Sequence, residues 1–487
     1  MFSTNKSLSV ILCLFLGPLI AVLVIIHPLV AVVCVALFFF SVLWFLNSPR
    51  LSVFLGYIFL GCLTGYAFLG KSFAYLGYPP IYIGEAFLFL GLLALLSSGR
   101  LKYAFRNSIT RLAIPFVIWG AIRTLPNLGV YGIDALRDGV IWAYFLFALI
   151  VFAFLDQKDS ISKVVVLYNR FIPWYLAWIP FAYLIGQFWS HLLPVLPISQ
   201  VPLLTIKPGD VAVHLAGIGA FLFLHPMEVT PSRSPLRAWL SKWARWALWI
   251  GGFLVSGSLT RGGLLSILSA FVVVFVMRPL SGLGKMLILL MTASVVLLIF
   301  DPRVDIGDRR IVSPQQIVEN FRSIARSPSF EMEATRQWRL EWWEDIVDYT
   351  LFGKYFWMGK GYGINLADSD GYQVVFYPPL RSPHNGHLNI LARSGVPGLL
   401  TWVLLQFLFA WKLVGAYSLA IRNHAPFWER TSLWILAYWT AFMVNSCFDV
   451  FLEGPQGGVW FWAIFGFGIA AIESQRIRIL PMVSATS

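Results

Sequence analysis

The sequence contains few charged residues and few cysteines for its length. Charged side chains make up 12% of the 487 residues and hydrophobic ones 58%, and the mean hydropathy is +0.75. Because a soluble chain carries about 25% charged residues, this composition excludes a soluble protein. The cysteines, Cys13, Cys34, Cys62 and Cys447, all lie in apolar runs with no CxxC pair and no histidine at ligand spacing, so we expect neither disulfides nor a metal site.

Motifs of nucleotide and metal chemistry are also absent. The chain has no Walker loop, no HExxH and no GxSxG, which argues against nucleotide-driven chemistry and against a cofactor. It has no internal repeat and no matching pair of broken helices in its two halves. Many secondary transporters carry such repeats, so their absence weakens a transporter interpretation and leaves it open.

Apolar runs recur along the whole chain. Many are 17 to 22 residues long, enough to cross a hydrocarbon core of roughly 30 Å as helices. The sequence therefore predicts an all-α, polytopic membrane protein with about fourteen (12–14) transmembrane helices and no signal peptide. The predicted spans are 8–26, 28–46, 51–69, 81–97, 111–122, 138–155, 171–189, 211–225, 245–258, 262–277, 285–300, 390–411, 432–450 and 459–473.

Basic residues separate the two faces of this predicted bundle. With both termini inside, twenty Lys and Arg fall in cytoplasmic segments, whereas the short outer loops hold only Lys71, Arg123, Arg137, Lys207 and Arg261. The positive-inside rule demands this asymmetry. Topology thus accounts for the net charge of +13, and we expect membrane lipids, not nucleic acid, as partners.

One long loop divides the chain into three regions. Residues 1–300 would form about eleven spans, 301–387 a domain on the outer, periplasmic or extracellular side, and 388–487 about three further spans. The loop holds ten basic and twelve acidic residues. It is nearly neutral, so we expect it to fold, and long loops on a helical scaffold often carry function.

Arg261 lies in Ser-Leu-Thr-Arg-Gly-Gly between two apolar runs, at their predicted outer end. An arginine that snorkels to the lipid headgroups is the simpler interpretation. An anion site is the alternative, because Gly262 and Gly263 would let a substrate approach the backbone while the guanidinium binds phosphate bidentately.

Residues 331–350 form a predicted amphipathic helix in the loop. Arg336, Arg339 and Trp343 fall at i, i+3 and i+7, hence on one face. They suit either ordinary helix ion pairs or a second phosphate-binding group beside an aromatic wall.

The stretch 378–402 holds the most informative polar residues. Ser382 and Pro383 predict the start of the helix that re-enters the membrane, with His384 in its first turn. The positive end of the helix dipole would keep His384 neutral near pH 7 and able to accept a proton. A capping or packing histidine is the alternative, and we expect His387 to be interfacial.

Two further polar groups fall inside predicted spans, Glu85 near the outer end of the fourth and His214 in the eighth. Carboxylates in membranes are costly and often functional. Glu85 is a candidate substrate contact or, alternatively, an ion-pair partner of Arg123 or Arg137.

Together these features resemble the O-antigen ligase and polymerase family of bacterial membrane glycosyltransferases. His384-Asn385, nine residues, Gly395, two residues and Gly398 match the ligase signature. Ser258-Leu-Thr-Arg261-Gly resembles the family's Ser-Arg-Gly segment, with Thr260 in place of the usual Ser. Arg339-Leu-Glu-Trp-Trp343 resembles its Arg-x-x-x-Trp helix, and Gly359-Lys-Gly-Tyr-Gly363 its glycine-rich turn.

The resemblance implies a GT-C-like fold and transfer of a glycan from undecaprenyl pyrophosphate to an acceptor hydroxyl, without nucleotide or metal, at the periplasmic face of a bacterial inner membrane. Departure of pyrophosphate needs fixed positive charge, which Arg261 and Arg339 would supply with Arg336 and Arg381 in support. His384 would orient or deprotonate the hydroxyl. The remaining candidate substrate contacts are Asn385, Trp343 and Glu85.

Several acceptors fit the same donor chemistry. A ligase uses lipid A core, a polymerase another carrier-linked repeat unit, and a protein O-oligosaccharyltransferase a Ser or Thr. The signature favours a ligase. Inversion by direct displacement is the simplest mechanism, because the sequence shows no carboxylate nucleophile beside the motif. A lipid-linked glycan flippase is a less favoured alternative from another class.

Overall fold

The structure, a computed structural model, describes residues 51–78, 81–155, 159–226, 235–278, 303–305, 311–325, 330–374 and 379–484. Within these ranges almost all regular structure is helical, so the predicted all-α class is confirmed. The exceptions are two short antiparallel pairs: β1 (Gly77–Tyr78) with β2 (Ile81–Tyr82), and β3 (Val304–Asp305) with β4 (Ile311–Val312).

The predicted apolar runs coincide with long helices wherever the chain is described, and the spans 8–26, 28–46 and 285–300 lie outside those residues. The long helices are α3 (Leu51–Leu69), α5 (Ile83–Ser97), α7 (Ser108–Thr124), α9 (Ile133–Ala143), α10 (Phe145–Phe154), α11 (Ser160–Phe188), α12 (Pro208–Leu224), α13 (Pro235–Leu259), α14 (Arg261–Met277), α19 (Gly386–Arg422), α20 (Pro426–Asn445) and α21 (Pro455–Ser484). Short elements between them are α4 (Lys71–Ala74), α6 (Leu101–Ala104), η1 (Leu125–Asn127), α8 (Leu128–Tyr131) and η2 (Ser190–Leu192).

Four described helices are long and apolar enough to cross a membrane: Ser108–Tyr131, Ser160–Phe188, Gly386–Arg422 and Pro455–Ile477. The bent pair α9 and α10, which meet at 42°, would make a fifth. The structure therefore supports a helical membrane protein, and it does not establish the predicted count of fourteen spans.

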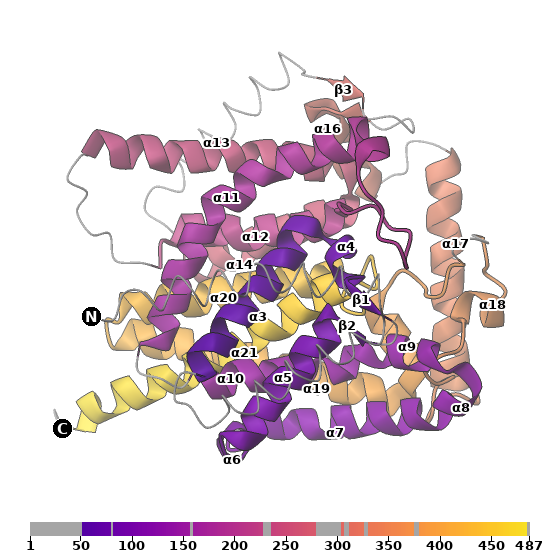
Figure 1. The fold of residues 1–487 in the computed structure, drawn as a ribbon, viewed down its shortest axis with the longest axis horizontal. Helices are drawn as coiled ribbons and strands as arrows, with labels where there is room; N and C mark the ends of the chain where they lie inside the picture. The colour runs from indigo at the N-terminus through magenta and orange to yellow at the C-terminus, as the bar shows by residue number, and fades with distance from the viewer. Residues whose placement is uncertain are drawn as a thin grey trace.

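Figure 1 shows the long helices lying side by side, with α17 (Phe330–Val347) standing across one end of them at a steep angle, at the right of the view. This helix confirms the one predicted over 331–350, and a π-helical turn, Asp348–Phe352, continues it. The other loop helices are α16 (Pro314–Ala325) and α18 (Leu366–Asp370).

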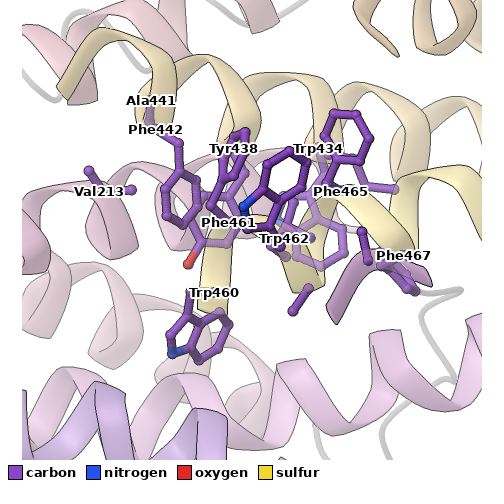
Figure 2. Close-up of a cluster of buried hydrophobic side chains, with 14 of the residues drawn as sticks. Val213, Trp434, Tyr438, Ala441, Phe442, Trp460, Phe461, Trp462, Phe465 and Phe467 are labelled. Atoms are coloured by element: carbon purple, nitrogen blue, oxygen red, sulfur yellow. The ribbon is translucent and has the colours of Figure 1, made fainter. Parts of the chain in front are cut away.

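Aromatic side chains fill the centre of the bundle. Figure 2 shows Trp434 and Tyr438 of α20 beside Phe461, Trp462 and other rings of α21. His214 is packed here too, and its Nδ1 lies 2.6 Å from the Tyr438 hydroxyl. Ring packing of this kind fixes α12, α20 and α21 relative to one another, and with them the loop that joins α20 to α21.

Helix α19 bends sharply at Gly395, whose φ of 66° and ψ of −170° are not helical. Trp402 Nε1 donates to His387 Nδ1 at 3.2 Å, although a straight helix would separate these residues by about 22 Å. A Cβ on Gly398 would meet the Ser394 Cβ at 2.1 Å, so the bend also needs a glycine there. The two signature glycines thus allow α19 to fold back.

The loop domain shares a core with the first segment of α19. Trp342 of α17 is fully buried and stacks on Tyr372 at 5.3 Å, and Leu391 and Ala392 of α19 belong to the same cluster. The boundary predicted between 387 and 388 therefore falls within the first turn of a helix that serves both regions.

Candidate functional site

His384 lies immediately before α19 instead of in its first turn. The helix begins at Gly386, and the Asn385 side chain accepts hydrogen bonds from the backbone nitrogens of His387 and Leu388 at 3.0 and 3.1 Å. The predicted Ser382-Pro383 start is wrong, because Asn385 provides the N-cap. Asn385, a predicted substrate contact, thus uses its side-chain oxygen for capping. His384 itself has a left-handed φ of 51°.

Helix α17 meets the chain beside His384. Trp343 Nε1 donates to the Pro383 carbonyl at 2.7 Å, so this ring holds the segment that carries His384. Arg339 is one turn earlier on the same helix and therefore projects on the same side. Arg336, a further turn back, is exposed.

Charged neighbours tune His384. Burial lowers the pKa of His384 below its usual value; Arg339 lowers it further, Asp449 opposes this, and Lys207 again lowers it. The imidazole is therefore neutral near pH 7 and can accept a proton, as predicted. The leading cause is burial, whereas the sequence interpretation had invoked the helix dipole alone.

Arg261 is the first residue of α14, directly after the N-cap Thr260, whose side chain accepts from Gly263 N at 3.3 Å. A Cβ on Gly262 would lie 2.8 Å from the Phe448 Cβ, and one on Gly263 would lie 2.5 Å from the Ala212 Cβ. The glycines therefore allow helix packing and do not leave room for a substrate against the backbone, contrary to the prediction.

Arg339 and Arg261 approach each other from different parts of the chain. Burial lowers the pKa of Arg339, Asp449 raises it, and Arg261 lowers it by repulsion. Among the described residues, no carboxylate forms an ion pair with either guanidinium, and like charges held near one another destabilise a fold.

Two residues of this cluster escaped the sequence interpretation. Lys207, the N-cap of α12, pairs with Asp449 through Nζ and Oδ2 at 3.5 Å, and Asp449 raises the pKa of Lys207, opposed by burial. We call Arg261, Arg339, Lys207, His384 and Asp449 the cationic cluster. Lys207 had one available signal, as one of the few basic residues in the predicted short outer loops.

Asp449 also corrects an expectation about mechanism. The sequence shows no carboxylate near the His384 motif, yet the α20–α21 loop brings Asp449 within electrostatic reach of His384. Its Oδ1 accepts from the backbone nitrogen of Val450 at 2.9 Å, and Oδ2 faces Lys207. A carboxylate therefore lies beside the motif and is held in place.

Arg381 lies in a different set of contacts. Its Nη1 donates to Asp134 at 3.1 Å, and its Nη2 to Asp138 at 3.0 Å and to the Gly363 carbonyl at 2.9 Å. Arg393 of α19, which has no exposed surface, pairs with the same Asp138 at 3.0 Å. These contacts engage both Nη atoms of Arg381 in a structural role, and its predicted support of pyrophosphate stays a prediction.

The pairs continue into the α20–α21 loop. Asn389 accepts from Arg393 Nε at 3.2 Å and donates to the buried carboxylate of Glu453. Burial raises the pKa of Glu453 to about 8, with Arg393 opposing it. We call Asp134, Asp138, Arg381, Arg393 and Glu453 the ion network.

Glu85 serves the start of α5. Its carboxylate accepts from Tyr82 N at 3.2 Å, as in a capping box, and from the Tyr144 hydroxyl at 2.7 Å. Arg137, one of its predicted partners, pairs instead with Asp134 and Asp138. These contacts give Glu85 a structural role, and no ion pair of Glu85 with Arg123 or Arg137 is formed among the described residues. Its substrate role stays a prediction.

The glycine-rich turn braces the bend in α19. Gly359, Gly361 and Gly363 all have positive φ, and a Cβ on Gly359 would meet the Arg393 carbonyl carbon at 2.5 Å. Lys360 N and Gly361 N donate to the carbonyls at which α19 breaks. The turn thus replaces helical hydrogen bonds lost at Gly395.

Among the described residues, no group of three His, Cys, Asp or Glu side chains is placed to hold a metal ion.

The family comparison concerns the same stretch of the chain as the motifs. The model of the family described as O-antigen ligase matches residues 246–403, which include Arg261, Arg339, His384 and the bend in α19. No curated protein matches the chain. The match supports the family that the motifs predict, and through residues 246–403 this chain is similar to the O-antigen ligase family.

Proposed function

We propose that this protein transfers a glycan from an undecaprenyl pyrophosphate carrier to an acceptor hydroxyl of lipid A core, at the periplasmic face of a bacterial inner membrane. The observation that carries the proposal is the cationic cluster, in which a neutral histidine lies among two arginines and a lysine. A diphosphate leaving group requires this combination of a proton acceptor and fixed positive charge.

Arg261, Arg339 and Lys207 would bind the pyrophosphate. Charge-assisted hydrogen bonds from guanidinium groups suit phosphate oxygens in pairs, and an ammonium adds a point charge. The bond from the anomeric carbon to the phosphate oxygen breaks as negative charge collects on that oxygen, and preorganised cations lower the barrier most at this stage. Arg336, exposed one turn from Arg339, would contact the outer part of the donor.

His384 would accept the proton of the acceptor hydroxyl while its oxygen attacks the anomeric carbon. Asp449, which raises the pKa of His384, would stabilise the imidazolium that results. The ion pair between Asp449 and Lys207 makes Asp449 a poor nucleophile, so we infer direct displacement with inversion and no metal. The polyprenyl tail would lie among the helices, both termini in the cytoplasm.

In vitro transfer tests the proposal. Purified protein in nanodiscs would receive an undecaprenyl pyrophosphate-linked glycan and either lipid A core or a second carrier-linked unit. We expect glycan-capped lipid A core, lost in His384→Ala and Arg261→Ala and retained in His191→Ala and Arg422→Ala, which alter exposed residues of the same types. Carrier-linked ladders would identify a polymerase, glycosylated protein an O-oligosaccharyltransferase, and translocation without a new glycosidic bond a flippase. Normal product from both site variants would overturn the site.

A further inference from the structure

A run of apolar side chains points outward from the loop domain just after α17. Phe352 is 82% exposed and Trp357 is 69% exposed, and Leu351 and Met358 are also exposed. We call the segment 351–358 the apolar tip. Large aromatic groups exposed together outside a span need a partner surface, because water alone disfavours them.

The backbone of the apolar tip is fixed against two helices that are long and apolar enough to cross a membrane. Val396 N of α19 donates to the Phe356 carbonyl at 2.8 Å, and Arg123 Nε at the end of α7 donates to the Met358 carbonyl at 2.5 Å. The exposed rings therefore belong to a defined surface and do not belong to a loosely tethered loop.

These contacts also set the height of the apolar tip. The apolar span that contains α7 runs from Ser108 to Tyr131, so it continues beyond Arg123 by about 12 Å of helix. The whole span is about 36 Å long, slightly more than the roughly 30 Å hydrocarbon core. Met358 is thus no further out than the outer end of this span.

The flank of α7 below the tip is apolar and exposed, as the flank of a membrane-spanning helix would be. Ile114, Ile118, Ile122 and Leu125 are exposed at helical spacing along one face, and only 22% of this span's most apolar stretch is buried inside the protein. The apolar tip is joined to the C-terminal end of this helix through Arg123, so its exposed rings lie next to an apolar surface that would meet acyl chains.

We propose that the apolar tip inserts into the outer leaflet of the membrane and anchors the loop domain to it. Trp357 and Phe352 would lie at the boundary of headgroups and acyl chains, where aromatic rings are most stable. Lys354, exposed between them, would reach the headgroup phosphates. The anchor would hold α17, and hence Arg339, at a fixed height above the lipid, and it does not depend on the proposed reaction.

Depth-dependent quenching tests the anchor. In a chain without native cysteines, Trp357→Cys or Phe352→Cys would be labelled with bimane and reconstituted in nanodiscs that contain lipid doxyl-labelled at acyl carbon 5. The control is Asp368→Cys on α18, an exposed polar position of the same domain. We expect quenching at 357 and 352 at least threefold greater than at 368.

Equal quenching at the tip and at 368 would overturn the proposal. Quenching that is absent in discs with one copy, combined with a blue shift in discs with two, would instead make the tip an interface between copies. Gel filtration and the bimane spectrum in detergent confirm that each variant is folded. Because Phe352 makes so little contact with the protein, its replacement keeps the test valid if Trp357→Cys does not fold.

Discussion

Two groups of charged side chains lie near each other in this protein and differ in how their charges are paired. In the ion network, Arg381 and Arg393 both donate to Asp138, and Asp134 accepts a further bond from Arg381. In the cationic cluster, Asp449 is the carboxylate paired with Lys207, while Arg261 and Arg339 repel each other. The network is balanced, and the cluster has surplus positive charge.

The difference separates a structural role from a functional one. A buried charge is costly unless it is paired, so a network in which every charge has a partner contributes by fixing the glycine-rich turn to α19. Surplus positive charge is destabilising until an anion arrives. Within the described part of the chain, the positive charge of the cationic cluster exceeds its negative charge, so the cluster should attract an anionic ligand.

The largest expected effect is on catalysis at the cluster. His384→Ala should lower the transfer rate by about 10²–10⁴-fold, the usual contribution of a general base, without changing the melting temperature by more than about 2 °C. Initial rates and thermal unfolding of the same nanodisc sample measure both. His191→Ala is the control, and a large loss of stability in His384→Ala would show that the histidine is structural.

The opposite result is expected in the ion network. Arg393→Met leaves Asp138 and Asn389 short of a buried partner, which should lower the free energy of unfolding by about 3–5 kcal/mol. Folded protein that remains should still transfer glycan. Thermal unfolding measures the loss of stability, and the transfer rate per folded molecule measures any loss of activity. A stable but inactive Arg393→Met would show that the ion network also has a functional role.

The helices and the family were within reach of the sequence because both depend on local patterns. The apolar runs predicted the long helices, and the spacing from His384 to Gly398 indicated the family whose model matches this region. The role of the spacing was less accessible: nine residues separate Asn385 from Gly395 because a helical segment must fit between its N-cap and the bend. Nothing in a periodic pattern shows that a helix folds back.

The site was only partly predictable for a physical reason. An isolated arginine looks the same whether it awaits a ligand or already has a carboxylate, and Arg381 differs from Arg339 only through Asp134 and Asp138, more than 240 residues earlier. Asp449 and Lys207 likewise meet across most of the C-terminal half. Ion pairs between distant segments determine whether each cation is free to bind a ligand, and the sequence alone does not show these pairs.

A smaller effect is expected on the pH dependence of transfer, and it tests how charges within the cationic cluster act on His384. Transfer should fall on the acid side as His384 becomes protonated. Arg339 lowers the pKa of His384 and Asp449 raises it, so Arg339→Gln should move the acid limb to higher pH and Asp449→Asn to lower pH. Profiles of kcat, each normalised to its own maximum, measure the two shifts. Shifts in the same direction would contradict the assignment of the limb to His384.

The last effect is expected at Glu453, and it concerns stability and not transfer. Burial raises its folded pKa to about 8, above the roughly 4.3 of an unfolded glutamate. Folding therefore favours the protonated carboxyl, and the stability this contributes is complete below about pH 4 and is lost as the pH rises toward 8. Glu453→Gln mimics the protonated form, so it should match the wild type near pH 4 and melt at a higher temperature near pH 9. A variant less stable than the wild type at pH 9 would mean that Glu453 is ionised in the folded protein and that Arg393 stabilises its charge. The ion network would then contain one more negative charge than the comparison with the cationic cluster assumes.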